Sequence, residues 1–164
     1  MHHATTVLSK LIFISAAILL GGYAQADGQH GGHSGAAAGA ASPIGQAGQA
    51  AQVTRTIEVD MSDAMRFSPD HLQVQAGETV RLQVKNSGQI RHELVLGTDA
   101  QLQDHYQMML QSPGMHHAEP NAVSLAGGES GQIIWQFQQA GTVSFGCLEP
   151  GHFPAGMKGS VTVK

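Results

Sequence analysis

Cysteine is almost absent from this 164-residue sequence, which contains a single one, Cys147. One cysteine excludes an internal disulfide. The sequence leaves three roles open for such a thiol: inert packing in a core, a cross-link between two chains, or a ligand for a metal.

Basic side chains are also scarce. The chain has 8 Lys and Arg against 12 Asp and Glu, which gives a formal net charge of −4. A mildly acidic chain lacks the basic patch that nucleic-acid binding requires, so nucleic acid is not an expected partner. Such a charge suits attraction to a basic protein surface instead.

Long hydrophobic runs are missing except for residues 11–20, LIFISAAILL. This run follows a weakly basic start and precedes residues 24–26, AQA, which is the order found in a secretory signal peptide with its cleavage site. The run is too short to cross a bilayer comfortably. We predict a signal peptide at residues 1–26 and export to the periplasm, with no membrane span after cleavage. A retained membrane anchor is the alternative.

Large apolar side chains are almost absent from residues 27–52, which are rich in Gly, Ala, Ser and Gln. Such a segment cannot bury enough surface to offset the entropy that ordering it would cost. We therefore predict a flexible leader at residues 27–52, followed by one folded domain at residues 53–164.

Period-two alternation of apolar and polar residues recurs through this domain and is typical of strands in a β-sandwich or barrel. The alternating runs are residues 54–60, 72–75, 79–84, 92–96, 132–137, 142–145 and 160–163. The sequence therefore predicts an all-β fold.

One segment, residues 98–111, has helical periodicity instead. Its apolar residues at helical spacing are Leu102, Tyr106, Met109 and Leu110. Thr98 and Gln101 stand at the positions of a capping box, which marks the start of a helix. We predict one short helix inserted between strands.

The stretch FGCLEPGHFPAGM places Cys147, His152 and Met157 at intervals of five residues. Each has an ordinary explanation alone, but a thiolate, an imidazole and a thioether together form a soft ligand set that suits copper. Zinc rarely accepts a thioether, and Mg²⁺ and Ca²⁺ prefer oxygen ligands. A trigonal copper site needs a second histidine, and His92 is the best candidate because it opens a strand after the turn at residues 86–88.

In these features, residues 53–164 resemble a cupredoxin of the plastocyanin and azurin superfamily. The matching motifs are Asn86 with Gly88-x-x-x-His92-Glu93 upstream and Cys147-x4-His152-x4-Met157 downstream. The resemblance implies a Greek-key β-sandwich that holds one type 1 copper. It also implies that His92 and the last-loop residues Cys147, His152 and Met157 are the ligands, with Asn86 tying the two ligand loops together.

Histidine and methionine exceed what one such copper site needs. A second copper-holding patch is a hypothesis, and its candidate residues are Met65, His105, Met108, Met109, Met115, His116 and His117. The alternative is that Met109 and Leu110 pack the helix and that residues 116–117 form a solvated loop. Similarly, His30 and His33 of the leader either capture copper or belong to a plain flexible tail.

The segments MRFSP at residues 65–69 and HELVLG at residues 92–97 are similar to those of periplasmic cupredoxins linked to copper tolerance. This resemblance implies a role in copper tolerance or homeostasis, with copper ions and a copper-export component or redox protein as partners. A soluble one-electron carrier between redox partners is the alternative.

An enzyme is not expected, because the neighbours of Cys147 are Gly146 and Leu148 rather than the histidines of multicopper oxidases. Oxidation of the cuprous ion is left open. A monomer is expected.

Overall fold

The computed structural model describes residues 42–112 and 119–164. The predicted signal peptide, most of the predicted leader with His30 and His33, and the patch residues Met115, His116 and His117 lie outside the described residues. Within these described ranges, no helix is both long and apolar enough to cross a membrane.

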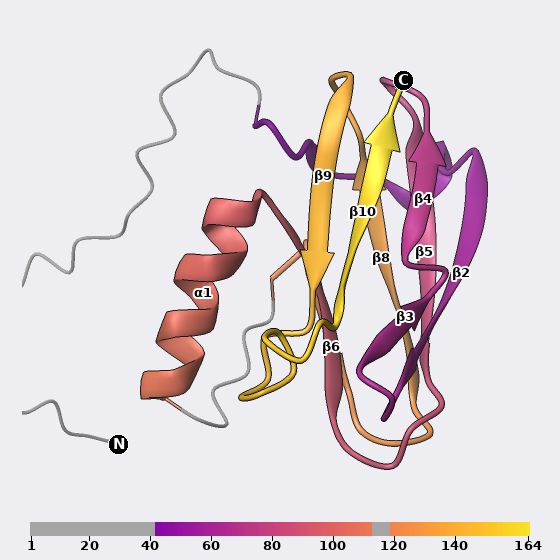
Figure 1. The fold of residues 1–164 in the computed structure, drawn as a ribbon. Coiled ribbons are helices and arrows are strands. Elements are labelled where there is room, and N and C mark those ends of the chain that lie inside the picture. The colour runs from indigo at the N-terminus through magenta and orange to yellow at the C-terminus, as the bar shows by residue number, and fades with distance from the viewer. Residues whose placement is uncertain (1–41, 113–118) are drawn as a thin grey trace, which may run out of the picture. The chain divides into compact units, whose positions relative to one another are not determined.

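Two five-stranded sheets pack against each other, and the chain passes between them in Greek-key order (Figure 1). The first sheet has the order β1 (Gln46–Ala47), β8 (Ser130–Gln136), β5 (Thr79–Asn86), β2 (Arg55–Ser62) and β3 (Arg66–Ser68). The second has the order β4 (His71–Val74), β10 (Lys158–Val163), β9 (Gly141–Gly146), β6 (His92–Gly97) and β7 (Ala122–Leu125). The predicted all-β Greek-key sandwich is confirmed.

The core between the sheets follows from the alternation seen in the sequence. In β5, Val80, Leu82 and Val84 are fully buried, while the intervening Arg81 and Gln83 are only partly so. We call the buried apolar group between the two sheets the sandwich core. Besides Val80, Leu82 and Val84, it includes Val59, Phe67, Leu94, Leu96, Val143, Phe145, Cys147 and Met157.

The inserted helix is confirmed as α1 (Asp99–Gln111), and both hydrogen bonds of the predicted capping box between Thr98 and Gln101 are present. Leu102, Tyr106 and Met109 face inward, whereas Leu110 is 44% exposed because it lies one residue, or about 100°, beyond the packed face. The expectation that Leu110 packs the helix is therefore wrong.

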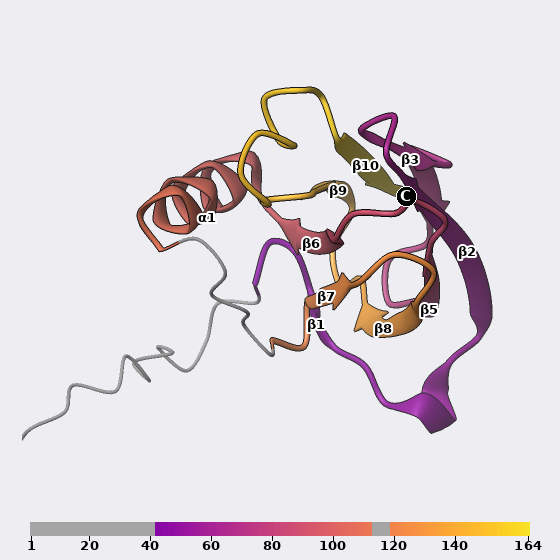
Figure 2. The same ribbon diagram turned by 90° about the horizontal axis from the view of Figure 1, so that it is seen from below.

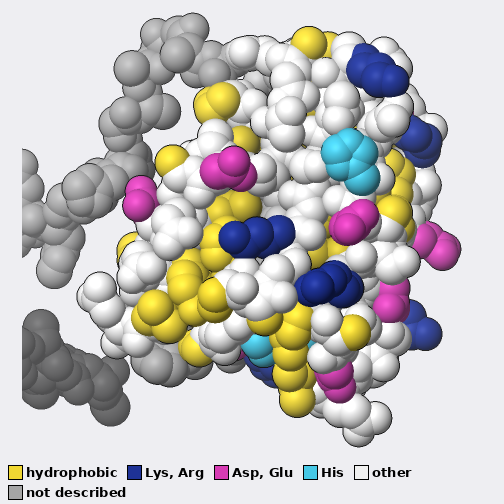
Figure 3. Space-filling view, viewed as in Figure 1, with side chains coloured by type: hydrophobic (Ala, Val, Ile, Leu, Met, Phe, Trp, Pro, Cys, Tyr) yellow, Lys and Arg dark blue, Asp and Glu magenta, His cyan; other side chains and the backbone are white. Residues whose placement is uncertain are grey.

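Helix α1 covers the outer side of β6, as Figures 1 and 2 show. This explains why every residue of β6 is buried: alternate positions face the sandwich core, and Val95 faces the helix. We call the second apolar group the helix cluster; its members are Val95, Leu102, Tyr106, Met109, Leu148 and Phe153. On the face drawn in Figure 3, hydrophobic side chains gather where α1 meets the strands, and charges of both signs are scattered over the rest.

The end of the predicted leader is ordered, which corrects the expectation of flexibility for residues 42–52. β1 pairs with β8 in an antiparallel register, and residues 50–52 form a short 3₁₀ helix. Ile44 is buried in the sandwich core and its carbonyl accepts a hydrogen bond from the Trp135 indole. Backbone pairing needs no large side chains, so the composition of this segment hid the strand.

Candidate metal centre

The pairing of β6 with β9 brings the two predicted ligand segments together. His92 opens β6, and Cys147 directly follows β9. The strands are antiparallel with Val95 opposite Gly146, so the start of β6 lies beside the residues that follow β9. His152 and Met157 belong to the loop between β9 and β10, residues 147–157, which we call the ligand loop.

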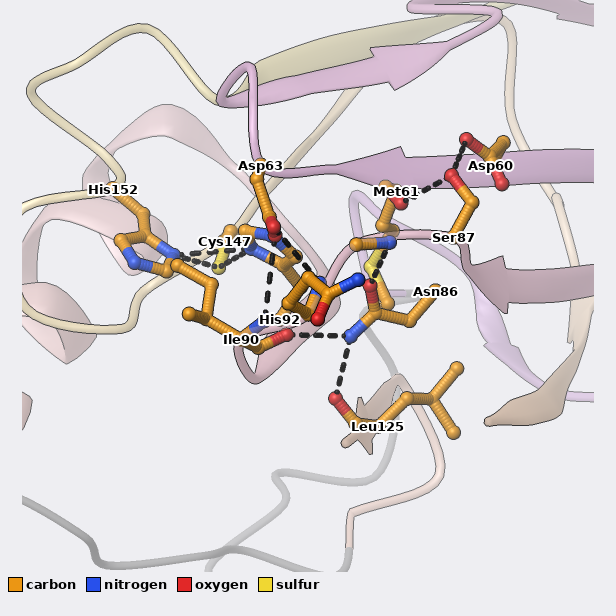
Figure 4. Close-up of polar contacts among 12 residues, drawn as sticks. Asp60, Met61, Asp63, Asn86, Ser87, Ile90, His92, Leu125, Cys147 and His152 are labelled. Carbon is orange, nitrogen blue, oxygen red and sulfur yellow. Dashed lines mark hydrogen bonds and ion pairs between the residues drawn. The ribbon is translucent and has the colours of Figure 1, made fainter. Parts of the chain in front are cut away.

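Three ligand atoms converge at this point. The Sγ of Cys147 lies 3.3 Å from Nδ1 of His152 and 4.0 Å from Nδ1 of His92, and the two Nδ1 atoms are 3.2 Å apart (Figure 4). All three atoms lie within 4.8 Å of one another. His92 and Cys147 are fully buried, whereas His152 is partly exposed. Two imidazoles and a thiol around one point form a site for a single soft metal ion.

Met157 lies in the same loop and is fully buried in the sandwich core. Its backbone N–H donates to the carbonyl of His152 at 3.2 Å, and its carbonyl accepts from the N–H of Cys147 at 3.1 Å. These bonds fold the ligand loop back on itself and hold Met157 beside the other two residues. Its service as a fourth ligand stays a prediction.

The electrostatics of the cluster fit a metal cation. Burial, with the carboxylates of Glu93 and Glu149 nearby, raises the pKa of the Cys147 thiol to about 12, although backbone N–H groups oppose the shift. A thiol in this setting ionises when a cation replaces its proton. Burial and the adjacent His92 lower the pKa of His152, which keeps its ring neutral and its lone pair available.

Asn86 is buried, and its side chain makes three hydrogen bonds. The amide donates to the carbonyl of Ile90 at 2.8 Å and of Leu125 at 3.0 Å, and its oxygen accepts from the N–H of Gly88 at 2.9 Å. These bonds tie the turn before His92 to β7. None of these three bonds reaches the ligand loop. Asn86 therefore fixes the turn before His92 but does not connect it to the ligand loop as expected.

Glu93 makes the connection that was expected of Asn86. Its backbone N–H donates to Cys147 Sγ at 3.4 Å, and its carboxylate accepts from the N–H of Leu148 at 2.9 Å. Burial raises the pKa of Glu93 to about 7, against the hydrogen bond from Leu148. A charged residue within the apolar run HELVLG was the signal that could have indicated this role.

Asp63 is the other polar residue at the centre that sequence reasoning missed. It lies in the turn between β2 and β3, and its Oδ1 is 3.1 Å from Nε2 of His92. No motif marks it, because 29 residues separate it from the histidine in the sequence.

A model of the copper binding proteins of the plastocyanin/azurin family matches residues 53–164. The chain belongs to this family. Copper is therefore the cofactor of this cupredoxin, and the site that can hold it within the described residues is the cluster of His92, Cys147 and His152.

Relatives of this cupredoxin include two proteins named copper-resistant cuproprotein CopI. That of Rubrivivax gelatinosus is 54% identical over 110 residues, which cover 67% of each chain. That of Pseudomonas aeruginosa is 34% identical, with 92% of this chain and 93% of the relative covered. Among solved structures, auracyanin B is similar with a TM-score of 0.59 and 28% identity, over 76% of this chain and 99% of that one.

The described candidates for a second copper patch do not form one group in this cupredoxin. Met65, in the turn between β2 and β3, packs against the sandwich core, whereas Met109 is buried in the helix cluster. Met108 is 56% exposed, and His105 is partly buried on α1. Burial of Met109 favours its packing role over a ligand role.

Proposed function

We propose that this cupredoxin is an exported periplasmic protein that binds copper at a type 1 site and serves copper tolerance. His92, Cys147 and His152, together with Met157, would hold the copper ion. The single observation that carries the proposal is the convergence of two Nδ1 atoms and one Sγ at the buried end of β6. The names of the two CopI relatives support the role in copper resistance.

Copper bound here supplies one-electron chemistry between Cu(I) and Cu(II). The chain contributes rigidity: His92 is fixed at a strand end, and Cys147 and Met157 are fixed in the sandwich core. A site held by packing from two segments changes little when the charge of the ion changes. Glu93 adds a backbone N–H to the sulfur and so stabilises the thiolate form of Cys147.

Residues 1–26 direct export, and the mature protein acts as a monomer with copper ions and a copper-export component or redox protein as partners. Leader residues His30 and His33, with Met115, His116 and His117 of the candidate patch, add weaker copper capture. Binding rather than enzymatic turnover is the main activity, with oxidation of the cuprous ion as the one reaction to assay.

A soluble one-electron carrier is the second candidate function. It is favoured by the partial exposure of His152 beside two fully buried ligands, because an exposed ligand edge lets electrons pass to a docked partner.

Copper titration followed by absorption spectroscopy tests the site. We expect one equivalent of Cu(II) to produce an intense visible thiolate-to-copper band, and Cys147→Ser to abolish it because the charge-transfer donor is gone. The same spectra of Met108→Leu provide a control, since that exposed residue lies outside the proposed type 1 site. A wild-type protein without the band would refute the site.

Growth of a deletion strain in rising copper tests the role. We expect the deletion to lower tolerance, the wild-type gene to restore it and the Cys147→Ser gene to fail. Normal tolerance together with a collapsed respiratory or photosynthetic rate would favour the electron carrier instead.

A further inference from the structure

Asp63 faces the ring of His92 on the side away from the convergent ligand atoms. Its Oδ1 lies 3.1 Å from His92 Nε2, while His92 Nδ1 lies 4.0 Å from the sulfur of Cys147 and 3.2 Å from Nδ1 of His152 (Figure 4). One ring nitrogen therefore points to the carboxylate and the other to the metal centre.

This arrangement decides which of the two ring nitrogens carries the proton when the His92 ring is neutral. A carboxylate only accepts hydrogen bonds, so Nε2 of His92 must carry the proton when it contacts Asp63. Nδ1 then presents its lone pair to Cys147 and His152. In metal sites, a carboxylate on the second nitrogen of a histidine fixes the ring orientation and raises its basicity.

The carboxylate of Asp63 is held in place by the turn that precedes His92. The backbone N–H of Gln89 donates to Oδ2 at 2.8 Å, and that of Ile90 approaches Oδ1 at 3.4 Å. Gly88 leaves the room for this approach, because a Cβ there would lie 2.0 Å from Oδ1. The contact is thus built by two segments, the β2–β3 turn and residues 87–90.

We propose that Asp63 is a positioning residue of the copper centre: it fixes His92 as the Nε2–H tautomer and places a negative charge behind the ring that favours Cu(II) over Cu(I). The proposal rests on the proposed function in one respect, since it takes His92 as a copper ligand. The side chain is 39% exposed, so the charge lies at the rim of the centre and screening by water limits its effect.

Asp60 provides a matched control. It precedes Asp63 by three residues, and its carboxylate accepts a hydrogen bond from Ser87 Oγ at 2.6 Å, on the same turn that holds Asp63. Asp60→Asn therefore removes one negative charge and perturbs the same turn without altering the partner of the His92 ring.

The first experiment measures the reduction potential of the copper-loaded protein for the wild type, Asp63→Asn and Asp60→Asn. Loss of a carboxylate behind a ligating histidine typically lowers metal affinity about 10–100-fold. We expect Asp63→Asn to weaken Cu(II) about tenfold more than Cu(I), which corresponds to a rise of about 59 mV for one electron. We expect Asp60→Asn to stay close to the wild type. Equal shifts in the two variants, or no shift in Asp63→Asn, would overturn the proposal.

The second experiment uses the metal-free protein, and its wild-type result alone can contradict the proposal. Nitrogen-15 NMR of the His92 ring should show the proton on Nε2 in the wild type and in Asp60→Asn, and a mixture of tautomers in Asp63→Ala. A wild-type ring protonated on Nδ1 would contradict the proposal. Because this measurement is independent of copper, it separates failure of the positioning role from failure of the copper site, which the titration reports.

Discussion

The sandwich core and the helix cluster hold the same loop from opposite sides, but they hold different residues of it. Cys147 and Met157, at the two ends of the ligand loop, are buried in the sandwich core. Leu148 and Phe153, between them, are buried in the helix cluster. Neighbouring residues of one irregular segment are therefore anchored in two separate apolar groups.

The two anchors differ in how they are built. The sandwich core draws alternate residues from both sheets, so its loss removes the reason for the sheets to pack. The helix cluster joins one helix, one strand and two loop residues. We infer that the sandwich core determines whether the domain folds and that the helix cluster determines how firmly the ligand loop is held. Changes in these two groups should have larger effects than changes in two polar contacts that lie outside both.

Phe145→Ala should be the most damaging change. Phe145 is fully buried in the sandwich core, and its ring packs edge to face on Phe67 with 5.0 Å between centroids. Removing such a side chain typically costs about 3–5 kcal/mol, a large part of the stability of one domain. Denaturant unfolding of the metal-free protein measures it. A loss below about 1 kcal/mol would contradict the central role of this core.

Leu102→Ala tests the helix cluster. We expect a smaller loss of stability, about 2 kcal/mol, because α1 can shift to fill part of the cavity. Copper should leave this variant faster than the wild type, since Leu148 and Phe153 lose a packing partner. Transfer of copper to a chelator measures the rate, with the exposed Leu110→Ala as the control. Wild-type release from Leu102→Ala would show that the helix does not restrain the loop.

Asn86→Ala tests a polar tie that belongs to neither apolar group. The change leaves the carbonyls of Ile90 and Leu125 without their amide donor, and leaving buried polar groups unpaired costs about 1–3 kcal/mol. We expect loosening to be local to the turn before His92. Hydrogen exchange should therefore rise at residues 87–91 before it rises in β9. A uniform rise through both sheets would argue against a local tie.

Glu78→Gln should have the smallest effect, because Glu78 and Arg55 form an ion pair near the surface, with 3.0 Å between Nε and Oε1. Burial alone would raise the pKa of Glu78, but the N–H of Gln75 and the guanidinium of Arg55 outweigh it and hold the pKa below its ordinary value. Its stabilisation is thus present above the unfolded-state pKa and is lost as pH falls through the folded one.

The pH dependence of this pair can be measured by unfolding the wild type and Glu78→Gln at about pH 7 and about pH 3. We expect a difference in unfolding free energy below about 1 kcal/mol at the higher pH and a smaller difference at the lower one. A difference that grows on acidification would contradict the assigned sign.

Most strands could be predicted because one of their faces is buried and the alternation is visible in the sequence. The three missed strands are short: β1 has two residues, β3 has three and β7 has four. β1 and β3 carry too few residues to show alternation, and β7, although as long as the predicted β4, has three partly buried residues in a row. These strands form because a longer neighbour offers its edge. For β1 that neighbour is β8, and Ile44, two residues before β1, is the large apolar side chain buried beside it.

The residues of the site also divide into those that sequence spacing reveals and those that only folding brings together. Cys147, His152 and Met157 are close in sequence, so their spacing indicates their chemistry directly. His92 was found because a turn precedes its strand. Asp63 was not found, since its contact depends on where the β2–β3 turn lies after folding.

The pairing of β1 with β8 has a practical consequence. The family match begins at residue 53, after β1 has ended. A chain shortened to begin there would leave the outer edge of β8 with unpaired backbone groups, and open edges invite other chains to add strands. Trimming the protein to residue 53 would thus expose the edge of β8 and favour self-association at high concentration.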